Sequence, residues 1–371
     1  MHRSELAGWL RLLLTPGVGR DTARRLLAAF GLPPDIFAQP ATRLAGIIPP
    51  RLVHALGTPP AELDEAIERH QAWLDAAPGI HHFITLGDED YPADLLAIAD
   101  PPLMLQVQGR LDVLRHPVRL AMVGSRHPTP QGQDNAHRFA RALGETGVCI
   151  VSGLARGIDA NAHEGALDAG APTIAVVGTG LDRVYPRQHA ALARRIVAGG
   201  GAIVSEYLLG TPPLAAHFPQ RNRIISGLSQ GTLVVEAALQ SGSLITARTA
   251  LEQGREVFAI PGSIHAPQSH GCHALIRQGA KLVESAQDIL EDLRLAPPPQ
   301  ALAAAITDHG GNDPTDDPLL QAMGFDPIGL DALQARTGEP TDRLQARLLE
   351  LELDGLIARL PGGLLQRQRS G

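Results

Sequence analysis

Between two short apolar segments the chain reads Phe218-Pro-Gln-Arg-Asn-Arg-Ile-Ile-Ser-Gly-Leu-Ser229. The pattern predicts a helix between two parallel strands, with Arg221 and Arg223 splayed apart on it. The sequence around these arginines is apolar and rich in glycine, whereas a helix that is simply exposed to solvent would not need such neighbours. Guanidinium groups in such a frame suit the phosphate oxygens of a nucleic acid strand. The stretch therefore favours a binding function over a catalytic one.

On both sides of this stretch, short apolar strands alternate with helical segments from residue 79 to residue 295. The alternation is typical of an α/β fold with a Rossmann-like, doubly wound parallel sheet. Two earlier segments, Phe83–Leu86 and Leu103–Val107, predict an antiparallel extension at one edge. The core strands are expected at Leu120–Val123, Cys149–Val151, Thr173–Val177, Ala202–Val204, Thr232–Val235 and Glu256–Ile260.

Residues 1–78 show a different, helical pattern that predicts a separate domain. Its segment Leu14-Thr-Pro-Gly-Val-Gly-Arg20 resembles the tight turn of a helix-hairpin-helix, and a blurred second copy follows at residues 44–57. The glycines of such a turn free backbone N–H groups that can meet a phosphate. A module that only packs and a module that weakly contacts DNA explain this pattern equally well.

The C-terminal part begins with residues 296–316, which have the composition of a linker, rich first in proline and then in glycine. Residues 317–371 predict three helices and a short hairpin, the outline of a small winged-helix-like domain. Acidic residues outnumber basic ones in its recognition helix, which is expected at Thr341–Asp354. Such a helix fits poorly in a major groove. We therefore expect it to contact protein or to pack, and duplex DNA reading is the weakest interpretation.

The overall composition limits the kinds of nucleic-acid contact. The chain has 371 residues, a formal net charge of -7 and an aromatic content of 3%. The negative charge excludes a wholly basic protein but allows a local basic groove. The few aromatic residues indicate that base stacking is not the main binding device. Lys281 is the only lysine, which we attribute to the base composition of the genome rather than to selection for arginine.

The cysteines and the N-terminal sequence bear on the cellular compartment. Cys149 and Cys272 show no CxxC spacing, which is typical of a reducing compartment. The N-terminal sequence does not resemble a signal peptide, and no apolar run is long enough to cross a bilayer. We expect a cytoplasmic protein that does not associate with membranes.

Loops rich in glycine and small hydroxyl residues follow the expected core strands. The carboxyl ends of parallel strands open on one rim of a sheet, where ligands bind. Glycines before small hydroxyl residues let backbone N–H groups approach an anion at a helix N-terminus. The loops begin at Gly124-Ser-Arg126, Ser152-Gly-Leu-Ala-Arg-Gly-Ile-Asp159, Gly178-Thr-Gly180, Ser205-Glu-Tyr207, Glu236 and Pro261-Gly-Ser263. Together with Arg126, Arg156, Arg221 and Arg223 they predict an anion groove.

The acidic residues of these loops are expected to have structural rather than catalytic roles. Asp159 is expected to cap the helix that begins near Ala160. Glu206 and Glu236 end buried strands, so each is expected to pair with an arginine. The histidines never fall at metal-ligand spacing, and a phosphate-binding P-loop and a complete dinucleotide fingerprint are missing. We expect no metal, no cofactor and no catalytic residues.

Several long motifs, in this order, resemble the DNA processing protein A family, also called DprA or Smf. They are Val123-Gly-Ser-Arg126, Ser152-Gly-Leu-Ala-Arg-Gly-Ile-Asp159, Gly178-Thr-Gly-Leu-Asp182 with Tyr185-Pro186, Phe218 through Ser229, Val235-Glu236 with Ser241-Gly-Ser-Leu-Ile-Thr-Ala247, and Gly254-Arg-Glu-Val-Phe-Ala-Ile-Pro-Gly262. The match covers the whole central domain, and the flanking helical (SAM-like) and winged-helix-like modules resemble those of the family as well.

The resemblance implies a homodimer, built on an extended Rossmann domain, that binds single-stranded DNA without sequence preference. Such a protein protects incoming strands and loads RecA onto them during natural transformation, and it is not an enzyme. The resemblance places the dimer and RecA surfaces around residues 275–293. The implied DNA contacts are Arg126 first, then Arg156, Arg221, Arg223, Ser243 and Lys281, with Gly124, Ser125, Gly153 and Gly157 as backbone donors.

Two positions depart from the family pattern, which often has asparagine where this chain has His189 and His273. Both are exchanges between polar residues, so we expect binding to survive. If either imidazole faces a phosphate, affinity will rise on acidification.

An enzymatic alternative starts from Gly231-Thr-Leu-Val-Val-Glu236. This segment resembles the phosphate-binding and glutamate motif of Rossmann-like nucleoside-monophosphate phosphoribohydrolases, in which Glu236 and an arginine would cleave the nucleotide. The paired glycines that precede the motif in those enzymes are replaced here by Leu228-Ser-Gln230. We rank this alternative below single-stranded DNA binding.

Overall fold

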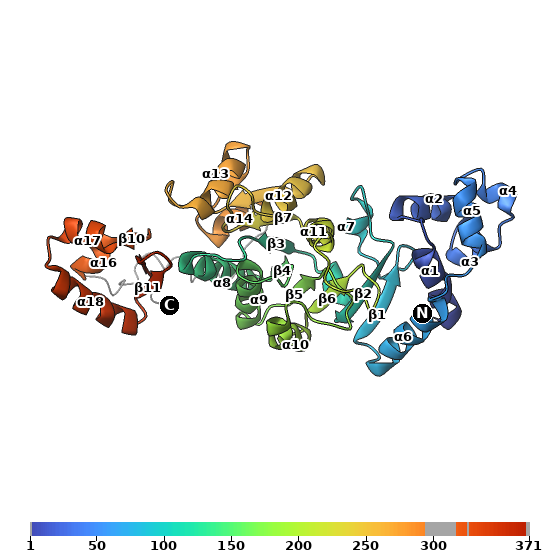
Figure 1. Ribbon diagram of the computed structural model, residues 1–371, viewed down its shortest axis with the longest axis horizontal. Coiled ribbons are helices and arrows are strands. Elements are labelled where there is room, and N and C mark those ends of the chain that lie inside the picture. Colours follow the sequence, from blue (N-terminus) through green and yellow to red (C-terminus); the bar gives the residue numbers. More distant parts are fainter. Residues whose placement is uncertain (1, 294–316, 325, 369–371) are drawn as a thin grey trace.

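The computed structural model describes residues 2–293, 317–324 and 326–368 of the chain. A nine-stranded sheet forms its centre, with the order β1-β2-β6-β5-β4-β3-β7-β8-β9 (Figure 1). The strands are β1 His81–Thr85, β2 Met104–Gly109, β3 Arg119–Val123, β4 Cys149–Ser152, β5 Thr173–Val176, β6 Ala202–Ser205, β7 Gly231–Val234, β8 Glu256–Ala259 and β9 Lys281–Leu282. The predicted α/β class and the six predicted core strands are confirmed.

Strands β3 to β8 pair in parallel, whereas β1 and β2 extend one edge in antiparallel register, as predicted. From β3 the chain first builds outward through β4, β5 and β6. It then returns to the other side of β3 to place β7 and β8. The strand order therefore reverses between β3 and β7, and in sheets of this kind ligands bind beside the carboxyl ends of the strands at that point.

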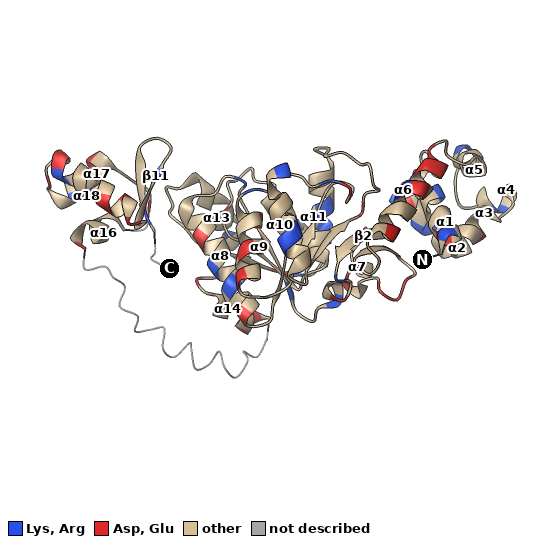
Figure 2. Cartoon of the chain, turned by 90° about the horizontal axis from the view of Figure 1, so that it is seen from below, with Lys and Arg blue, Asp and Glu red and all other residues tan. Residues whose placement is uncertain are grey.

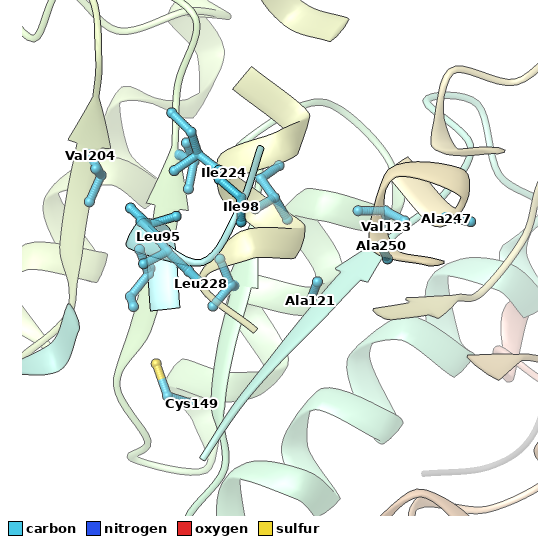
Figure 3. Close-up of a cluster of buried hydrophobic side chains, with 14 of the residues drawn as sticks. Leu95, Ile98, Ala121, Val123, Cys149, Val204, Ile224, Leu228, Ala247 and Ala250 are labelled. Carbon is cyan, nitrogen blue, oxygen red and sulfur yellow. The ribbon is translucent and has the colours of Figure 1, made fainter. Parts of the chain in front are cut away.

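Helices cover both faces of the sheet because the strands are apolar on both sides. Along β3, Ala121 and Val123 face one hydrophobic cluster, and Leu120 and Met122 face another. Figure 3 shows the first cluster, where Ile224 and Leu228 pack with Leu95 and Ile98 over the strands. The helices are α7 Ala93–Leu96, α8 Pro130–Glu145, α9 Ile158–Asp168, α10 Ala190–Ala198, α11 His217–Gly227, α12 Ser243–Glu252, α13 His270–Arg277 and α14 Ala286–Asp292, with 3-10 turns η1 Asp112–Arg115, η2 Arg187–His189 and η3 Pro267–Ser269.

The N-terminal residues form a helical unit whose own core includes Leu6, Trp9, Leu10 and Leu26. Phe83 of β1 and Met104 of β2 belong to the same cluster, so the unit packs on the antiparallel edge of the sheet. The helices are α1 Arg3–Leu14, α2 Arg20–Phe30, α3 Pro33–Phe37, α4 Ala41–Leu44, α5 Pro50–Gly57 and α6 Leu63–Ala76. The turn between α1 and α2 contains Gly17 with φ of 81°, a value that favours glycine.

The C-terminal residues form a small winged-helix unit around Leu333, Leu344 and Leu348. Its three strands are antiparallel in the order β10-β12-β11. The elements are α16 Pro318–Met323, β10 Ile328–Gly329, α17 Leu330–Thr337, α18 Thr341–Leu353, β11 Ile357–Leu360 and β12 Leu364–Arg367. The predicted linker at 296–316 lies outside the described residues.

Candidate nucleic-acid interface

A pocket of about 500 Å³ opens at the point where the strand order reverses. The loops after β3, β4 and β7 form its walls, together with the first turns of α11 and α12. The lining residues are Val123, Gly124, Ser125, Arg126, Ala155, Asp159, Phe218, Pro219, Arg221, Asn222, Ala238, Gln240, Ser241, Gly242, Ser243, Ile245 and Thr246. We call this pocket the switch-point groove. Figure 2 shows acidic and basic residues interspersed along the chain, so a local groove rather than a basic face has to carry any phosphate contact.

Arg126 stands exposed in the loop after β3 and lines the groove. Its guanidinium carbon lies 5.6 Å from the centre of the Phe218 ring, and no carboxylate pairs with it in the described part of the chain. The Phe218 ring lies 5.5 Å from that of Tyr185, which is 47% exposed. A free guanidinium and two aromatic rings therefore stand together at this rim, an aromatic pair that the low aromatic content had not indicated.

Arg221 reaches the groove from α11 but is only 4% exposed. Its Nη2 donates to the Gly153 carbonyl at 2.8 Å and lies 4.0 Å from the Asp159 carboxylate. Burial lowers the pKa of Arg221 to about 10, so the group stays charged at neutral pH. Its Nε has no hydrogen-bond partner among the described residues. Arg221 thus places a charged guanidinium, fixed by the Gly153 carbonyl and by Asp159, in the wall of the groove, an arrangement that favours an anion.

Asp159 does not cap α9, which corrects the expectation from the sequence. The helix begins at Ile158 with Gly157 as its N-cap. The Asp159 carboxylate instead accepts the backbone N–H groups of Gly153 and Ala155, at 3.1 and 3.2 Å. Burial raises the pKa of Asp159, against the opposing effect of Arg221 and these N–H groups. The side chain thus shapes the loop after β4 and partly neutralises Arg221.

The rim glycines serve close packing, and two of the expected backbone donors are already engaged. The N–H of Ser125 donates to the Glu236 carbonyl at 2.7 Å, and that of Gly153 donates to Asp159. A Cβ at Gly153 would lie 1.7 Å from Nη1 of Arg221, and one at Gly124 would lie 2.6 Å from Ile158. Gly157 has φ of 76°, a value that favours glycine over residues with a side chain. The amides of Ser125 and Gly153 are therefore bonded within the protein, and their contact with DNA stays a prediction.

Ser243 is the first residue of α12, and its hydroxyl lies 2.6 Å from that of Ser241. Both hydroxyls line the groove, as does Gly242 at the N-cap. The N–H of Ser243 donates to the Ser241 hydroxyl at 3.3 Å, and those of Leu244 and Ile245 donate to the Ser241 and Gly242 carbonyls at 3.1 Å. The positive end of the helix dipole, rather than free N–H groups, is therefore what α12 directs toward this space. The sequence placed Ser243 correctly at this rim.

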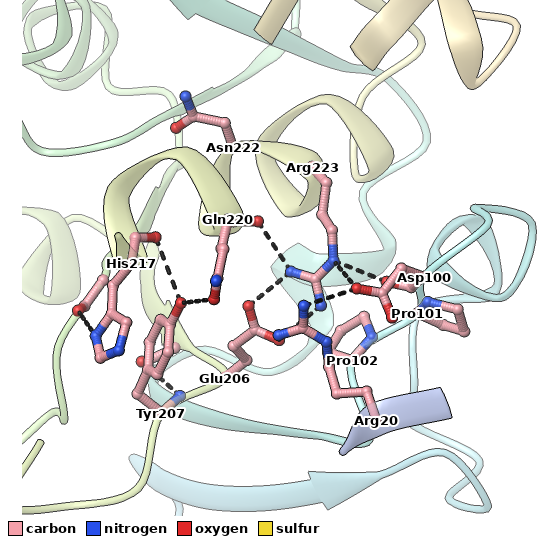
Figure 4. Close-up of polar contacts among 12 residues, drawn as sticks. Arg20, Asp100, Pro101, Pro102, Glu206, Tyr207, His217, Gln220, Asn222 and Arg223 are labelled. Atoms are coloured by element: carbon pink, nitrogen blue, oxygen red, sulfur yellow. Dashed lines mark hydrogen bonds and ion pairs between the residues drawn. The ribbon is translucent and has the colours of Figure 1, made fainter. Parts of the chain in front are cut away.

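Arg223 does not line the groove, although it lies only two positions after Arg221. Its guanidinium is bonded to Glu206 at 2.6 Å and to Asp100 at 3.1 Å (Figure 4). Two positions on a helix are about 200° apart, so the side chains of Arg221 and Arg223 leave α11 on opposite sides. The prediction of a groove contact is wrong for Arg223. The expected arginine partner of Glu206 is confirmed.

Other predicted residues lie around or away from the groove. Arg156 is exposed next to Ala155, which lines the groove. Lys281 sits on the edge strand β9 and pairs with Asp292, so it is not part of the groove. His189 is buried, with Nδ1 at 2.8 Å from the Leu154 carbonyl, whereas His273 is half-buried and contacts Gly262. The environment of His189 leaves no place for a phosphate contact.

Among the residues that the structure describes, no arginine pairs with Glu236, contrary to expectation. Its two carboxylate oxygens accept the N–H and the hydroxyl of Thr129, both at 2.9 Å, at the N-terminus of α8. Burial raises the pKa of Glu236, against these two hydrogen bonds. The side chain is not among the residues that line the switch-point groove. It therefore faces a different neighbourhood from Arg221 and Arg126.

The described residues offer neither a metal site nor a membrane span. They contain no group of three or more histidine, cysteine, aspartate or glutamate side chains arranged to hold a metal ion. Nor does any of their helices have the length and apolar character needed to span a bilayer.

The winged-helix unit presents an acidic and apolar recognition helix. On α18, Leu344, Leu348 and Leu351 are buried, while Leu349 and Leu353 are 52% and 80% exposed. The exposed acidic residues of the helix and its end are Asp342, Glu350 and Asp354. These features suit a protein contact better than a phosphate backbone.

The comparisons with known proteins agree with this architecture. A family model described as DNA recombination-mediator protein A matches residues 82–294, and a model described as DprA winged helix domain matches residues 295–363. Protein Smf of Escherichia coli is 47% identical over 313 residues, or 82% of each chain. DNA processing protein DprA of Streptococcus pneumoniae is 50% identical over 205 residues, which are 55% of this chain and 72% of that protein.

Two solved structures are similar over much of the chain. The crystal structure of DNA processing protein A from Streptococcus pneumoniae has a TM-score of 0.63 at 39% identity and covers 78% of this chain and 98% of its own. DNA processing protein A from Helicobacter pylori, a structure that describes a single-stranded DNA binding mode, has a TM-score of 0.51 at 32% identity. That match covers 57% of this chain and 95% of the other.

Proposed function

The chain belongs to the DNA recombination-mediator protein A family, also called DprA or Smf, and on that premise we propose that it binds single-stranded DNA in the switch-point groove. One observation carries the proposal. Two arginines from different elements, Arg126 and Arg221, line one groove together with the N-terminus of α12. Each of these groups attracts anions: Arg126 has no carboxylate partner among the described residues, and Arg221 has one, Asp159, at 4.0 Å.

The groove offers separate places for a phosphate and for a base. Arg221 and the first turn of α12 line the inner part and suit a phosphate oxygen. Arg126 and the rings of Phe218 and Tyr185 stand at the rim, where a base can stack without being read. Both devices act on the backbone or on any base face, so we expect binding without sequence preference.

We propose that the protein is not an enzyme. The carboxylate in the groove, Asp159, is bonded to two backbone N–H groups and lies beside Arg221, which leaves it poorly placed to exchange protons with a substrate. The enzymatic alternative required Glu236 beside a bound nucleotide. Its bonds to Thr129 and its place outside the groove weaken that alternative.

The wider role follows from family membership. We propose that a cytoplasmic homodimer protects incoming single strands and loads RecA onto them during natural transformation and recombination. The Helicobacter pylori relative, whose structure concerns single-stranded DNA binding, supports the first step. For the winged-helix unit we propose a protein contact through α18, because its outward face combines leucines with carboxylates.

A binding assay with matched oligonucleotides tests the central proposal. We expect single strands to bind more tightly than duplexes, with a log–log salt slope near -0.7 for each phosphate contacted. Arg126→Ala should weaken binding to all sequences alike. Arg194→Ala on α10 removes the same charge from an exposed site outside the groove and should bind like the wild type. An affinity that does not change with salt, or an equal effect of both variants, would contradict the proposal. Release of free base from nucleoside monophosphates would favour the enzymatic alternative.

A further inference from the structure

Charged residues from α2, from α11 and from the segments between them meet in one set, which we call the α2–α11 cluster: Arg20, Arg24, Asp100, Glu206 and Arg223. Figure 4 shows Arg20, Asp100, Glu206 and Arg223 of this cluster. Arg20 lies 2.9 Å from Asp100 and 3.4 Å from Glu206. Arg24 lies 2.5 Å from the other oxygen of Asp100. Arg223 joins the same two carboxylates from α11. The cluster therefore connects a helix near the start of the chain to the helix that bears Arg221.

The charges on the two sides of this contact complement each other. The N-terminal unit supplies two guanidinium groups, from Arg20 and Arg24. The side of the sheet supplies the guanidinium of Arg223 and the carboxylates of Asp100 and Glu206, so by itself it carries an excess of negative charge. Glu206 is buried with a side chain only 5% exposed, and Arg223 is 11% exposed. Arg223 already bonds to both oxygens of Glu206, at 2.6 Å each. Docking of the N-terminal unit therefore adds guanidinium partners mainly to Asp100, whose side chain is 32% exposed and whose charge would otherwise be shared with Arg223 alone.

Helix α11 is held from both sides by its two arginines. On one side Arg221 bonds to the loop after β4 and lines the groove. On the other side Arg223 also donates to the backbone carbonyls of Asp100 and Gln220, at 2.8 and 3.0 Å. Because Asp100 and Glu206 lie outside α11, the bonds of Arg223 to them help to fix the turn of α11 that carries Arg221 and Asn222.

We propose that Arg20 and Arg24 are positioning residues for the DNA groove, which hold α11 in place through Asp100, Glu206 and Arg223. The inference rests on the proposed binding of single-stranded DNA in that groove. It also assigns a task to the predicted helix-hairpin-helix: Arg20, at the first turn of its second helix, faces the sheet and docks the unit. This use agrees with the packing interpretation of the hairpin rather than with the DNA-contact interpretation.

The test compares Arg20→Ala/Arg24→Ala with Arg25→Ala/Arg43→Ala in the full-length chain. Arg25 and Arg43 are exposed, belong to the same unit and lie outside the cluster, so both double variants lose the same charge. Two readouts are needed: single-stranded DNA affinity over a salt series, and amide hydrogen exchange of α11 without DNA. A third variant, Arg20→Lys/Arg24→Lys, restores the charge.

For Arg20→Ala/Arg24→Ala we expect affinity to fall by about fivefold or more relative to the control. We also expect faster exchange in α11, an unchanged salt slope, and partial recovery in the lysine variant. A salt slope that weakens by about 0.7 for each arginine would instead show direct phosphate contact and overturn the inference. Affinity and exchange equal to those of the control would overturn it as well.

The experiment separates this inference from the proposed function. If the wild-type protein binds no single-stranded DNA, the proposed function fails, and with it the positioning of a DNA site. If the wild type binds single-stranded DNA, and Arg20→Ala/Arg24→Ala has the same affinity and exchange as Arg25→Ala/Arg43→Ala, the proposed function stands and the positioning role fails. Should the double variant not fold, Arg20→Ala alone, paired with Arg25→Ala, is judged by the same readouts.

Discussion

The two sides of α11 show how one residue type performs different tasks within one helical turn. Toward the groove, Arg221 bonds to a carbonyl, has one carboxylate at 4.0 Å and keeps a free Nε. Toward the N-terminal unit, Arg223 meets two carboxylates at 2.6 and 3.1 Å and two carbonyls. Both are mostly buried. The number of acceptors around each guanidinium, rather than its burial, distinguishes Arg221, which we propose to bind DNA, from Arg223, which is bonded within the protein.

The largest effect is expected for Arg223→Ala, which tests the structural side of this comparison. The change leaves the buried Glu206 with Arg20 alone, at 3.4 Å. Loss of one partner of a buried pair typically costs about 3–5 kcal/mol. We expect a free energy of unfolding lower by about that amount in urea denaturation. A loss below about 1 kcal/mol would show that the cluster is not a structural element.

Arg221→Ala tests the binding side and should change the salt dependence as well as the affinity. The variant loses a charged donor in the groove, so we expect roughly tenfold weaker binding to single strands and a salt slope weaker by about 0.7. Asp159 also loses its guanidinium neighbour, so stability must be measured in parallel. Arg221→Lys keeps the charge and serves as the control. An unchanged slope in Arg221→Ala would remove Arg221 from the phosphate contacts.

Arg126→Ala should separate binding from stability more cleanly than either α11 variant. Arg126 is exposed, so we expect the free energy of unfolding to change by less than about 0.5 kcal/mol. Affinity for single strands should still fall, because both the charge and its place over Phe218 are lost. Anisotropy titrations beside thermal unfolding test this. A large loss of stability would mean that Arg126 also has a structural role.

Acid should weaken the α2–α11 cluster through Asp100. Burial alone would raise its pKa, but hydrogen bonding to Arg24 and the charges of Arg223 and Arg20 outweigh it and hold the pKa below the ordinary value of 3.8. A depressed pKa contributes stability that is complete above the unfolded value and disappears as the pH falls through the folded value. We therefore expect docking of the N-terminal unit, followed by small-angle scattering, to loosen only below about pH 4. Asp100→Asn should lack this transition, and a transition of equal size in both proteins would assign it to other groups.

The smallest effect is expected for Leu349→Ser/Leu353→Ser on α18. Both side chains are exposed and lie away from the buried leucines of the helix. We expect affinity for single strands and for duplexes to stay within about twofold of the wild type, because apolar side chains contribute little to phosphate contact. Loss of duplex affinity in this variant, or on removal of residues 317–371, would revive the duplex-reading interpretation.

Local patterns were sufficient to predict the sheet and its rim. The core strands are short apolar runs, four of the six predicted ones followed directly by glycine or serine, and such runs are recognisable without distant contacts. The strand β9 was missed because it has only two residues, Lys281 and Leu282, and two exposed residues cannot show a periodic apolar pattern. Arg126 and Arg221 line the groove as expected, because loops that follow parallel strands open on the same rim, and Ser243 lines it as the family resemblance implied.

Interactions between distant segments produced the errors. Asp100 lies 123 positions before Arg223, and Arg20 lies 186 positions before Glu206. No spacing rule joins such residues, so Arg223 looked like a second phosphate contact. Likewise, Glu236 was expected to find an arginine, but it is bonded to the N-cap residue of α8, 107 positions earlier.

The sequence by itself determined the order of strands and helices, the side of the sheet on which the glycine-rich loops open, and the residue types available there. These properties depend on backbone periodicity and turn chemistry, which act over a few residues. Only the tertiary structure decided which guanidinium keeps free donors, which amides are already bonded, and how the N-terminal unit meets α11. Those outcomes depend on which acceptors are brought within hydrogen-bonding distance when remote segments pack together.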